Sequence, residues 1–335
     1  MTSQDKVHRE TSGAKAETPL PLVTLVVLFY NQEAFVSEAV RGALQQQYDN
    51  LEIILTDDGS TDETFVCIEK SVREYHGVHR VVVRRNIRNL GLAGHMNEAM
   101  KHAHGEIILL AGGDDISWPT RTQHSVEVLQ SDPSIMCVSF GSVRFSDEVP
   151  DLPEPIEKSG ERSMKVYSLE DFICDSQIHT NGACRAIRRS VVDYFGPLNA
   201  QVPTEDSTYL LRALLRGKAA QVSTPEVFYR IHGSNLYASP HKHDFDYTAI
   251  HEQYCRDVSH CRECGDINRT TEQRLMRALE RKLRCRQLRS GFYKTSHPKA
   301  FVLLHILPSR YVSKGVKFRY FKDAFIHSSK SGAVS

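Results

Sequence analysis

The sequence predicts an α/β fold, with a mainly parallel β-sheet flanked by helices. Between residues 21 and 115, β-branched apolar runs alternate with segments whose apolar residues recur every three to four positions. The first pattern is typical of strands that are buried on both faces, and the second is typical of amphipathic helices. Because the alternation is unbroken, it favours parallel strands joined by helical crossovers.

The elements of this half follow one another closely. The stretch "PLVTLVVLFYN" contains the first strand, and "EAFVSEAVRGALQQQ" repeats its apolar residues with a helical period. Three more strands are expected in "LEIILTDD", "HRVVVRRN" and "EIILLAGGDD", with helices over Glu63–Tyr75 and in "GLAGHMNEAMKHAHG".

The pattern changes after Asp132–Pro133. We expect a strand in "IMCVSFGSVRF", helical fragments in "SLEDFICD" and "RSVVDYFG", and irregular structure in "QIHTNGACRAIR". A helix should follow "PTED", because leucines recur through "STYLLRALLRG". The stretch "EVFYRIHGSN" is expected to be a short strand that leads into a loop.

The two ends of the chain differ from its body. Residues 1–18 are polar and of mixed charge, so we expect a disordered leader over residues 1–19 and no signal peptide. The longest apolar runs, Leu22–Tyr30 and Ala300–Leu307, are shorter than the roughly 18 to 20 residues that span a bilayer. The region 241–335 is expected to be helical and basic.

Cysteine usage favours a cytoplasmic protein, since eight cysteines are scattered without a disulfide framework. Within "CRDVSHCREC", Cys255, Cys261 and Cys264 have a spacing seen in zinc sites. No second pair at a comparable spacing follows, so free thiols on a surface helix or loop are the preferred interpretation and a metal site is the alternative.

Charge is unevenly distributed along the chain. The formal net charge is only +1, so no global field would attract nucleic acid. From Arg269 to Asp323, however, fifteen Lys and Arg residues face three acidic ones, a net charge of +12. The rest of the chain is therefore acidic, and nucleic acid is not expected as a partner.

Three pairs of adjacent carboxylates lie at predicted element boundaries: Asp57–Asp58, Asp114–Asp115 and Glu205–Asp206. Adjacent carboxylates repel each other, and a cation shared with another negative group relieves the repulsion; a solvated acidic turn is the alternative. Ligands of parallel sheets bind beyond the carboxyl ends of the strands, where "FYN", "DDGS" and "GGDD" converge. Since no glycine-rich phosphate loop is evident, a nucleotide held through a divalent cation suits this crevice.

The sequence resembles the family 2 glycosyltransferases of GT-A fold, from about residue 20 to residue 238. Six motifs carry the resemblance in the family order: "VVLFYNQEAFVSEAV", "LEIILTDDGSTDET", "NLGLAGHMNEAM", "GEIILLAGGDDISWPTR", "TEDSTYLLRALLRG" and "YRIHGSN". One motif alone is weak evidence, whereas all six in order are strong. The resemblance implies a Rossmann-like, mainly parallel sheet flanked by helices, here followed by the basic C-terminal extension.

The resemblance also implies roles for the matching positions. Asp206 matches the catalytic base, and Asp114 matches the aspartate that binds Mg²⁺ or Mn²⁺, with His232 turned toward the metal or the diphosphate. Gly112 stands where the family usually has an aspartate that contacts ribose or sugar. The positions that match nucleotide contacts are Tyr30, Asn31, Glu33, Asp58, Asn89, Asn97 and Asp115.

Simpler interpretations remain for four of these positions. Asn97 packs or caps on a helix face, His232 lies in a loop without a ligand, and Tyr30 is a half-buried aromatic at a strand end. Asp57 serves the turn geometry more than a ligand.

The expected function is transfer of a sugar, with inversion, from a nucleoside diphosphate sugar to an acceptor hydroxyl in cell-surface polysaccharide or glycan assembly. A carboxylate at Asp58 accepts from an imide N–H, which favours UDP or dTDP. Residues 20–135 would bind the nucleotide sugar and residues 136–240 the acceptor, a glycan or lipid-linked glycan, through loops 145–165 and 174–186. The alternatives are a non-catalytic nucleotide-sugar-binding or scaffold protein and, less favoured because "FYNQEAF" lacks a basic glycine-rich loop, a nucleotide-sugar pyrophosphorylase.

The basic tail has two interpretations. The stretch "TEQRLMRALERKLRCRQLR" places Leu275, Leu279 and Leu283 on one helix face among many arginines. The helix either docks these leucines on the acidic body or lies on an anionic membrane surface. We expect the membrane contact, peripheral and at the inner face, because acceptors of similar enzymes are often lipid-linked.

Overall fold

The computed structural model describes residues 19–146, 148, 163–174, 178, 182–233, 235 and 247–325. The expected leader, up to residue 18, lies outside the described residues. So do most of the expected acceptor loop 145–165 and nearly half of the other, 174–186.

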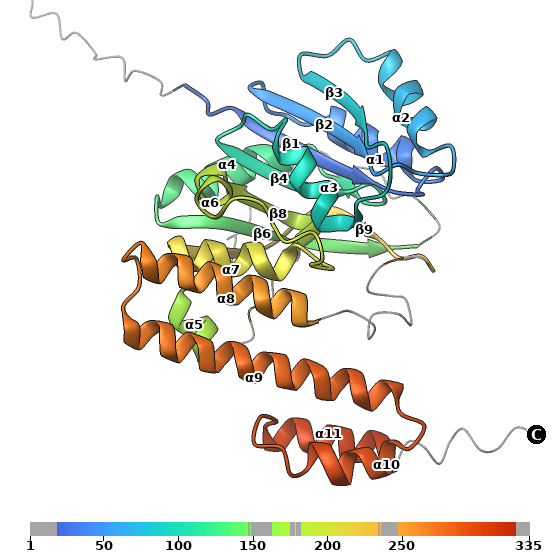
Figure 1. The fold of residues 1–335 in the computed structure, drawn as a ribbon. Helices are drawn as coiled ribbons and strands as arrows, with labels where there is room; N and C mark the ends of the chain where they lie inside the picture. Colours follow the sequence, from blue (N-terminus) through green and yellow to red (C-terminus); the bar gives the residue numbers. More distant parts are fainter. Residues whose placement is uncertain are drawn as a thin grey trace, which may run out of the picture.

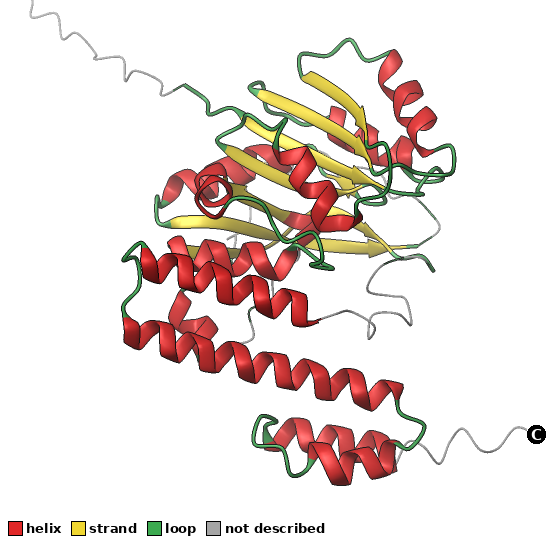
Figure 2. Ribbon diagram, viewed as in Figure 1, coloured by secondary structure: helices red, strands yellow, loops and turns green. Residues whose placement is uncertain are grey.

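A nine-stranded sheet forms the centre of the molecule, in the order β3-β2-β1-β4-β8-β6-β9-β5, with β7 paired to β9 (Figures 1 and 2). Four neighbouring strands are parallel, as the sequence predicts. They are β1 (Val23–Phe29), β2 (Leu51–Asp57), β3 (Arg80–Arg85) and β4 (Ile107–Gly112).

The other strands make the sheet mixed. Between β4 and β6, β8 runs antiparallel to both, while β9 is parallel to β6 and antiparallel to β5 and β7. Their bounds are β5 (Ile116–Ser117), β6 (Ile135–Phe145), β7 (Met164–Tyr167), β8 (Arg185–Arg188) and β9 (Lys218–Arg230).

Helices cover both faces of this sheet (Figure 2). Along β1, Leu25 and Val27 join the apolar cluster under one set of helices, and Val26 joins the opposite cluster. Strands buried on both faces explain why their sequences are continuously apolar. The first set contains α1 (Val36–Leu44), α2 (Thr64–Arg73) and α4 (Arg121–Ser131), and the second contains α3 (Gly91–Met100), α6 (Arg189–Phe195) and α7 (Asp206–Arg216).

Two strands differ from expectation. The segment expected to be irregular contains β8, whose first residue, Arg185, is fully buried and interrupts the apolar pattern. The expected short strand is the end of β9, which has 13 residues and pairs with β6 through register shifts around Gly141 and Pro225. A proline at such an irregularity is tolerated, although it hides the strand from pattern reading.

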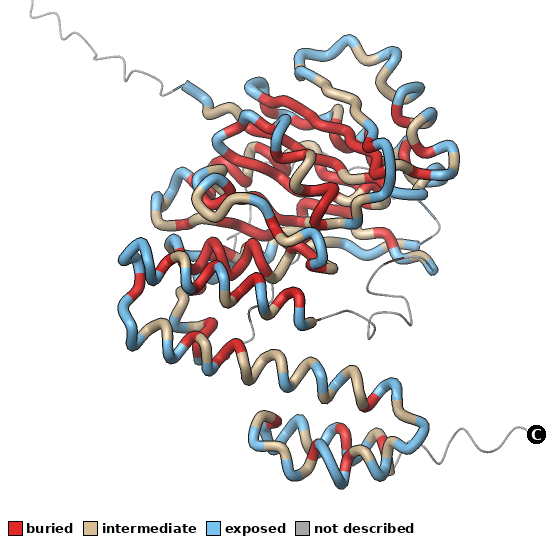
Figure 3. The backbone as a smooth tube through the Cα atoms, viewed as in Figure 1, coloured by how far each residue is buried: buried red, intermediate tan, exposed pale blue. Residues whose placement is uncertain are grey.

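The C-terminal helices extend from the face of the sheet that α7 covers (Figures 1 and 3). The first is α8 (Tyr247–Glu263), and a buried ion pair from Arg212 Nε to Asp257 Oδ2, 2.8 Å long, joins it to α7. On α9 (Arg269–Lys294), Leu275 and Leu279 are buried in the same cluster, with the short α5 (Leu169–Ile173) beside it. The expectation that these leucines enter a membrane is therefore wrong, because they already pack on the body.

Beyond α9, the chain forms α10 (Pro298–Phe301), the π-helical turn η3 (Val302–Ile306) and α11 (Lys314–Phe325). These segments pack on the end of α9 around their own small apolar cluster, which includes Phe292, Ile306 and Tyr320. No helix within the described residues is both long enough and apolar enough to cross a bilayer.

Candidate active site

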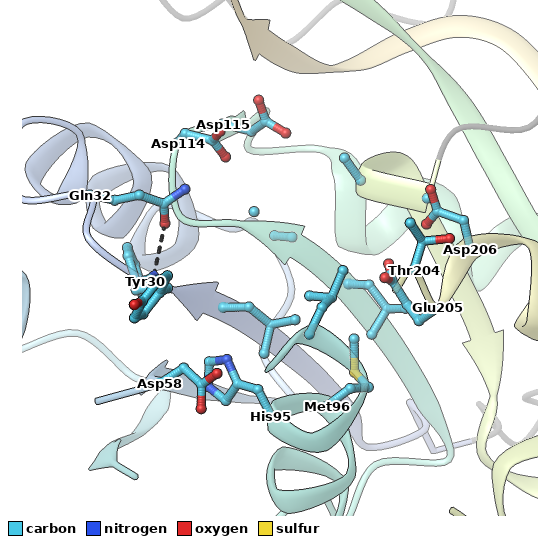
Figure 4. A pocket seen from close by; sticks show the side chains of 18 of the residues that line it. Tyr30, Gln32, Asp58, His95, Met96, Asp114, Asp115, Thr204, Glu205 and Asp206 are labelled. Carbon is cyan, nitrogen blue, oxygen red and sulfur yellow. Dashed lines mark hydrogen bonds between the residues drawn. The ribbon is translucent and has the colours of Figure 1, made fainter. Parts of the chain in front are cut away.

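A cavity of about 380 Å³ lies beyond the carboxyl ends of β1, β2 and β4 (Figure 4). Five carboxyl groups line it: Asp58, Asp114, Asp115, Glu205 and Asp206. The described lining residues include no lysine or arginine. The three predicted carboxylate pairs therefore meet at one site, apart from Asp57, and a phosphate group there would need a cation.

Two turns at the mouth of the cavity are tied together by hydrogen bonds. Asn31, with a φ of 49°, donates its N–H to Ser60 Oγ at 2.9 Å and accepts the Thr61 N–H on Oδ1 at 2.9 Å. The next N–H, of Gln32, donates to Thr64 Oγ1 at 2.7 Å. These bonds fix the turn after β1 against the turn after β2.

Glu33 belongs to the same link, because its Oε2 accepts the Glu63 N–H at 2.8 Å. Neither Asn31 nor Glu33 is among the residues that line the cavity, so nucleotide contacts for both stay predictions. Tyr30 does line the cavity, beside Gln32, whose Oε1 accepts the Tyr30 N–H at 3.3 Å (Figure 4). The ring of Tyr30 is partly exposed and available to a flat ligand.

The two aspartates after β2 have different tasks. Asp57 is fully buried, accepts the Ser60 N–H at 3.1 Å and pairs with Arg85 Nε at 3.1 Å, so it serves the turn geometry as predicted. Asp58 lines the cavity and accepts from Asn86 Nδ2 at 2.7 Å and from the Leu90 N–H at 3.1 Å. Burial raises the pKa of Asp58, while these donors lower it.

Sequence reasoning did not single out Asn86 or His95. Asn86 follows β3, the position at a strand's carboxyl end that identified the other polar clusters, and that signal could have found it. His95 lines the cavity from α3, and its Nε2 lies 2.8 Å from Thr56 Oγ1, which accepts from Arg84 Nη1 at 2.7 Å. Burial and the nearby Arg84 lower the pKa of His95 to about 3, so its imidazole is neutral.

The two asparagines of the third motif lie in different places. Asn89 lines the cavity, and its Oδ1 accepts the Gly91 N–H at 2.7 Å. Asn97 exchanges two hydrogen bonds with the main chain of Leu198, at 2.7 and 2.8 Å, and is not among the lining residues. Its contacts match the packing alternative, and a nucleotide contact for it stays a prediction.

Asp114 and His232 come together, as the family resemblance implies. His232 Nε2 lies 3.0 Å from Asp114 Oδ2, and Asn235 Nδ2 donates to the same oxygen at 3.3 Å. The His232 ring also packs against Phe35, with 4.5 Å between ring centroids. Asn235 lines the cavity and is a further site residue that sequence reasoning missed, although it closes the "YRIHGSN" motif.

Asp115 points into the protein and ties the acidic turn to β9. Its Oδ1 accepts the Arg230 N–H at 3.0 Å, and Arg230 Nε donates to the Asp114 carbonyl at 3.0 Å. The Arg230 guanidinium lies 4.8 Å and 4.4 Å from the ring centroids of Phe35 and Phe145. Burial and the neighbouring Asp114 raise the pKa of Asp115 well above its ordinary value.

The side-chain atoms around Asp114 are suited to binding a divalent ion that is also bound by the phosphate oxygens of a ligand. A carboxylate oxygen and an imidazole nitrogen converge there, a mixed set that Mn²⁺ accepts. Within the described ranges, no group of three or more His, Cys, Asp or Glu could hold a metal alone. Mg²⁺ and Mn²⁺ in nucleotide sites commonly take one or two carboxylates and complete their shell with substrate oxygens.

Asp206 begins α7 on the opposite wall of the cavity (Figure 4). Its Oδ1 is buried and accepts no hydrogen bond within the described part of the chain. The buried Arg185 donates from Nη1 to the Asp206 carbonyl at 2.5 Å. Burial, and Asp206 beside it, raise the pKa of Glu205 well above its ordinary value.

Gly182, in the 3₁₀ turn η1 (Gly182–Cys184), provides the space for this carboxylate. A Cβ on Gly182 would lie 1.3 Å from Asp206 Oδ1, a separation that no pair of nonbonded atoms tolerates. The position of the Asp206 carboxylate therefore depends on a residue without a side chain. Nothing in the motifs singled out this glycine.

The cysteines of "CRDVSHCREC" lie on α8 and at its end. Cys261 is buried in the apolar cluster, Cys264 is exposed, and Cys255 Sγ lies 3.5 Å from His251 Nε2.

Comparison with known proteins identifies the family. The profile described as Glycosyl transferase family 2 matches residues 24–195, just over half of the chain. The chain belongs to the family 2 glycosyltransferases. EpsE of Bacillus subtilis (strain 168) is 32% identical over 142 residues, which cover 40% of this chain and 50% of EpsE. The Escherichia coli UDP-Glc:alpha-D-GlcNAc-diphosphoundecaprenol beta-1,3-glucosyltransferase WfaP is 25% identical over 227 residues, which cover 67% of this chain and 82% of WfaP. The matched segment thus spans half of EpsE and most of WfaP.

Solved structures share the fold of this family 2 glycosyltransferase. S. aureus TarS 1-349 in complex with UDP-GlcNAc has a TM-score of 0.57 at 17% identity, covering 90% of this chain and 79% of TarS. The mannosyltransferase PcManGT from Pyrobaculum calidifontis, in complex with GDP-Man and Mn2+, has a TM-score of 0.54 at 17% identity, covering 94% and 87%. The predicted GT-A fold, with a C-terminal helical region, is confirmed.

Proposed function

We propose that this glycosyltransferase moves a sugar from a uridine or thymidine diphosphate donor to an acceptor hydroxyl, with inversion at the anomeric carbon. One observation supports this most strongly. Asp206 lines the same cavity as Asp58 and Asp114, across from Tyr30, and no residue in the described part of the chain donates a hydrogen bond to its Oδ1 (Figure 4). A base on one wall and a phosphate-binding position on the other suit a displacement in line.

Asp206 acts as the general base. It takes the proton of the acceptor hydroxyl while the acceptor oxygen bonds to the anomeric carbon and the bond from that carbon to the diphosphate oxygen breaks. A positioned base contributes about 10²- to 10⁴-fold. Asp206 begins α7, and Arg185 holds its main chain in place. Because the nucleophile is the acceptor itself, the configuration inverts in one step.

The other wall binds the donor. The carboxylate of Asp58 accepts the imide N–H of the base, and the ring of Tyr30 stacks on it, while Asn89 contacts the nucleotide from the turn before α3. Asp114 and His232 would hold a Mn²⁺ or Mg²⁺ ion together with the diphosphate. When bound, this ion offsets the negative charge that grows on the leaving group.

The acceptor is proposed to be a glycan or lipid-linked glycan in cell-surface polysaccharide or glycan assembly, met at the inner face of the membrane. WfaP, the relative that this chain matches over most of its length, acts on a diphosphoundecaprenol-linked sugar. Residues 20–135 form the donor half, and residues 136–240, which contain Asp206, form the acceptor half.

A thermal-shift panel tests the donor side. UDP, dTDP, GDP and ADP are each added to the full chain with Mn²⁺ and with EDTA. A ligand at 100 times its dissociation constant stabilises the folded state by about 2.7 kcal/mol. We expect the largest shift with UDP or dTDP in Mn²⁺, and a clear preference for GDP or ADP would contradict the role of Asp58. The anomeric configuration of the product, read by NMR, tests inversion.

The non-catalytic alternative predicts a different outcome. A protein that only binds the nucleotide sugar would show the same thermal shifts but no slow hydrolysis of the donor and no transfer to any acceptor. Asp206 Oδ1 accepts no hydrogen bond from any described residue, and this favours the enzyme, because a binding protein has no use for such a buried acceptor at that position.

A further inference from the structure

The C-terminal unit, which we define as residues 294–325, carries large apolar side chains on its surface. Phe318 is 68% exposed, Phe321 38%, Leu303 51% and Leu304 70%. These side chains are not part of the unit's own core, because α10, η3 and α11 already enclose a separate apolar cluster around Ile306 and Tyr320. Exposed apolar groups that gather in one place mark an interaction surface.

These residues lie on two neighbouring elements, the leucines on η3 and the phenylalanines on α11, which packs against η3 and α10. On α11, Phe318, Phe321 and Phe325 follow at three- and four-residue steps and so share one side of the helix. The rings of Phe321 and Phe325 stack with centroids 4.6 Å apart. Lys299 Nζ of α10 lies 5.8 Å from the centroid of the Phe325 ring, and Leu303 follows Lys299 by one turn. We call Leu303, Leu304, Phe318 and Phe321 the apolar face.

The surroundings of the apolar face are strongly basic. From Lys294 to Phe325 there are seven Lys and Arg residues and a single acid, Asp323, a net charge of +6. Lys314 and Lys322 are exposed and lie one helical turn before and after Phe318. Apolar side chains bordered by cations complement an anionic lipid surface, whose phosphates meet the cations while the apolar groups enter the interface.

The unit is also placed to reach such a surface. It lies at the far end of α9, a helix of 26 residues whose first turns are anchored in the main apolar cluster (Figures 1 and 3). At 1.5 Å per residue, α9 is about 39 Å long. The apolar face is therefore held away from the sheet and the cavity.

We propose that the C-terminal unit docks on an anionic membrane surface through its apolar face and the flanking lysines. This deepens the proposed function and rests on it in one respect, since it names the surface through which the enzyme meets a lipid-linked acceptor. Self-association through the same face is disfavoured, because two copies with a net charge of +6 each would be brought together.

Co-sedimentation of the full chain with vesicles tests the proposal. Phosphatidylcholine vesicles with and without phosphatidylglycerol are compared at low and high salt. We expect binding only to the anionic vesicles, weakened by salt. The double variant Phe318→Ser/Phe321→Ser and the double variant Lys314→Glu/Lys322→Glu should each lower the partition coefficient about tenfold or more.

Two matched controls are provided by the catalytic body. Val78→Ser/Ile87→Ser removes two side chains that are 79% and 105% exposed, and Lys70→Glu/Arg73→Glu reverses two exposed charges on α2. Both should bind vesicles like the wild type. Wild-type binding by the apolar-face variants would overturn the proposal. So would a dimer, seen by analytical ultracentrifugation without lipid, that Phe318→Ser/Phe321→Ser dissociates.

The readouts separate this proposal from the proposed function. The apolar-face variants should keep the nucleotide-dependent thermal shift, because their side chains lie outside the cavity. Asp206→Asn should keep vesicle binding and lose turnover. If the wild type transferred the sugar but did not bind vesicles, only the membrane-surface proposal would be refuted. If it bound vesicles but transferred no sugar, only the proposed enzyme activity would be refuted.

Discussion

The cavity has two walls whose carboxylates are bonded differently. We call the side with Asp58, Asp114 and Asp115 the donor wall, and the side with Glu205 and Asp206 the base wall. On the donor wall, Asp58 and Asp115 accept hydrogen bonds from Asn86 and from main-chain N–H groups. On the base wall, Asp206 Oδ1 is buried against Gly182, and none of the described residues donates a hydrogen bond to it. A buried unpaired acceptor costs about 1–3 kcal/mol. The carboxylates of the donor wall are therefore held in fixed positions, whereas Asp206 keeps an oxygen to which no described residue donates, as the proposed base would.

The largest expected effect comes from removing that acceptor's basicity. Asp206→Asn keeps the size of the side chain but cannot take a proton, so kcat should fall by at least about 10² while the Kd for UDP changes little. Steady-state transfer and calorimetric binding measure the two quantities. Asp193→Asn, an exposed aspartate on α6, is the matched control and should leave both unchanged. Near-normal turnover in Asp206→Asn would transfer the role to Glu205.

A substitution on the donor wall should affect donor binding rather than proton transfer. Asp114→Ala removes the carboxylate that faces His232, and the affinity for UDP in Mn²⁺ should fall more than about tenfold, toward the affinity in EDTA. Asp115→Ala should affect the metal response less, because its bond is to the Arg230 main chain. Titration of UDP with and without Mn²⁺ measures both variants. An unchanged Mn²⁺ response in Asp114→Ala would show that the ion, if it binds, has other ligands.

A substitution at Gly182 tests the position of the Asp206 carboxylate without changing an ionisable group. In Gly182→Ala the new methyl would meet Asp206 Oδ1 at 1.3 Å, so the carboxylate must move. Misplacing a reacting group by about 1 Å can cost up to 10²-fold, and we expect kcat to fall about tenfold or more with little change in UDP binding. Gly315→Ala, where no atom lies within 4 Å of the new Cβ, is the control. Wild-type kcat in Gly182→Ala would mean that Asp206 has no required position.

The donor wall was more predictable from sequence than the base wall, for a physical reason. The strands β1 to β4 are buried on both faces, so local composition identifies them, and the acids at their ends follow. On the base wall, β8 begins with Arg185, a buried cation whose partner, the Asp206 carbonyl, is 21 residues away. From sequence alone, a charged residue within a short apolar run predicts a loop, because the partner that allows it to be buried lies far away in the chain.

Individual contacts were the least predictable feature. Asn31 and Asn97 are residue types that bind ligands or main chain equally well, and here both bond to the main chain. His95 lies among apolar residues of α3 and looks like an ordinary core histidine in the sequence. Only the fold reveals that the same helix face borders the cavity.

The smallest expected effect concerns Glu205 and appears in stability rather than in turnover. Burial and Asp206 raise the pKa of Glu205 in the folded protein, whereas in the unfolded chain a glutamate titrates near 4.3. Below about pH 4.3 both states carry the proton and the stabilising contribution is complete. As pH rises toward the folded-state pKa, only the unfolded state loses its proton, so stability is lost by up to about 1.4 kcal/mol per pH unit. Glu205→Gln cannot titrate. The Tm of the variant relative to the wild type should therefore rise between pH 4 and pH 8, measured by circular dichroism, with kcat largely retained.

Glu69→Gln, on the exposed face of α2, should give a Tm difference from the wild type that does not change with pH. Should the Glu205→Gln difference stay equally flat, Glu205 would be ionised in the folded protein, and both carboxylates of the base wall would then be candidates for the base.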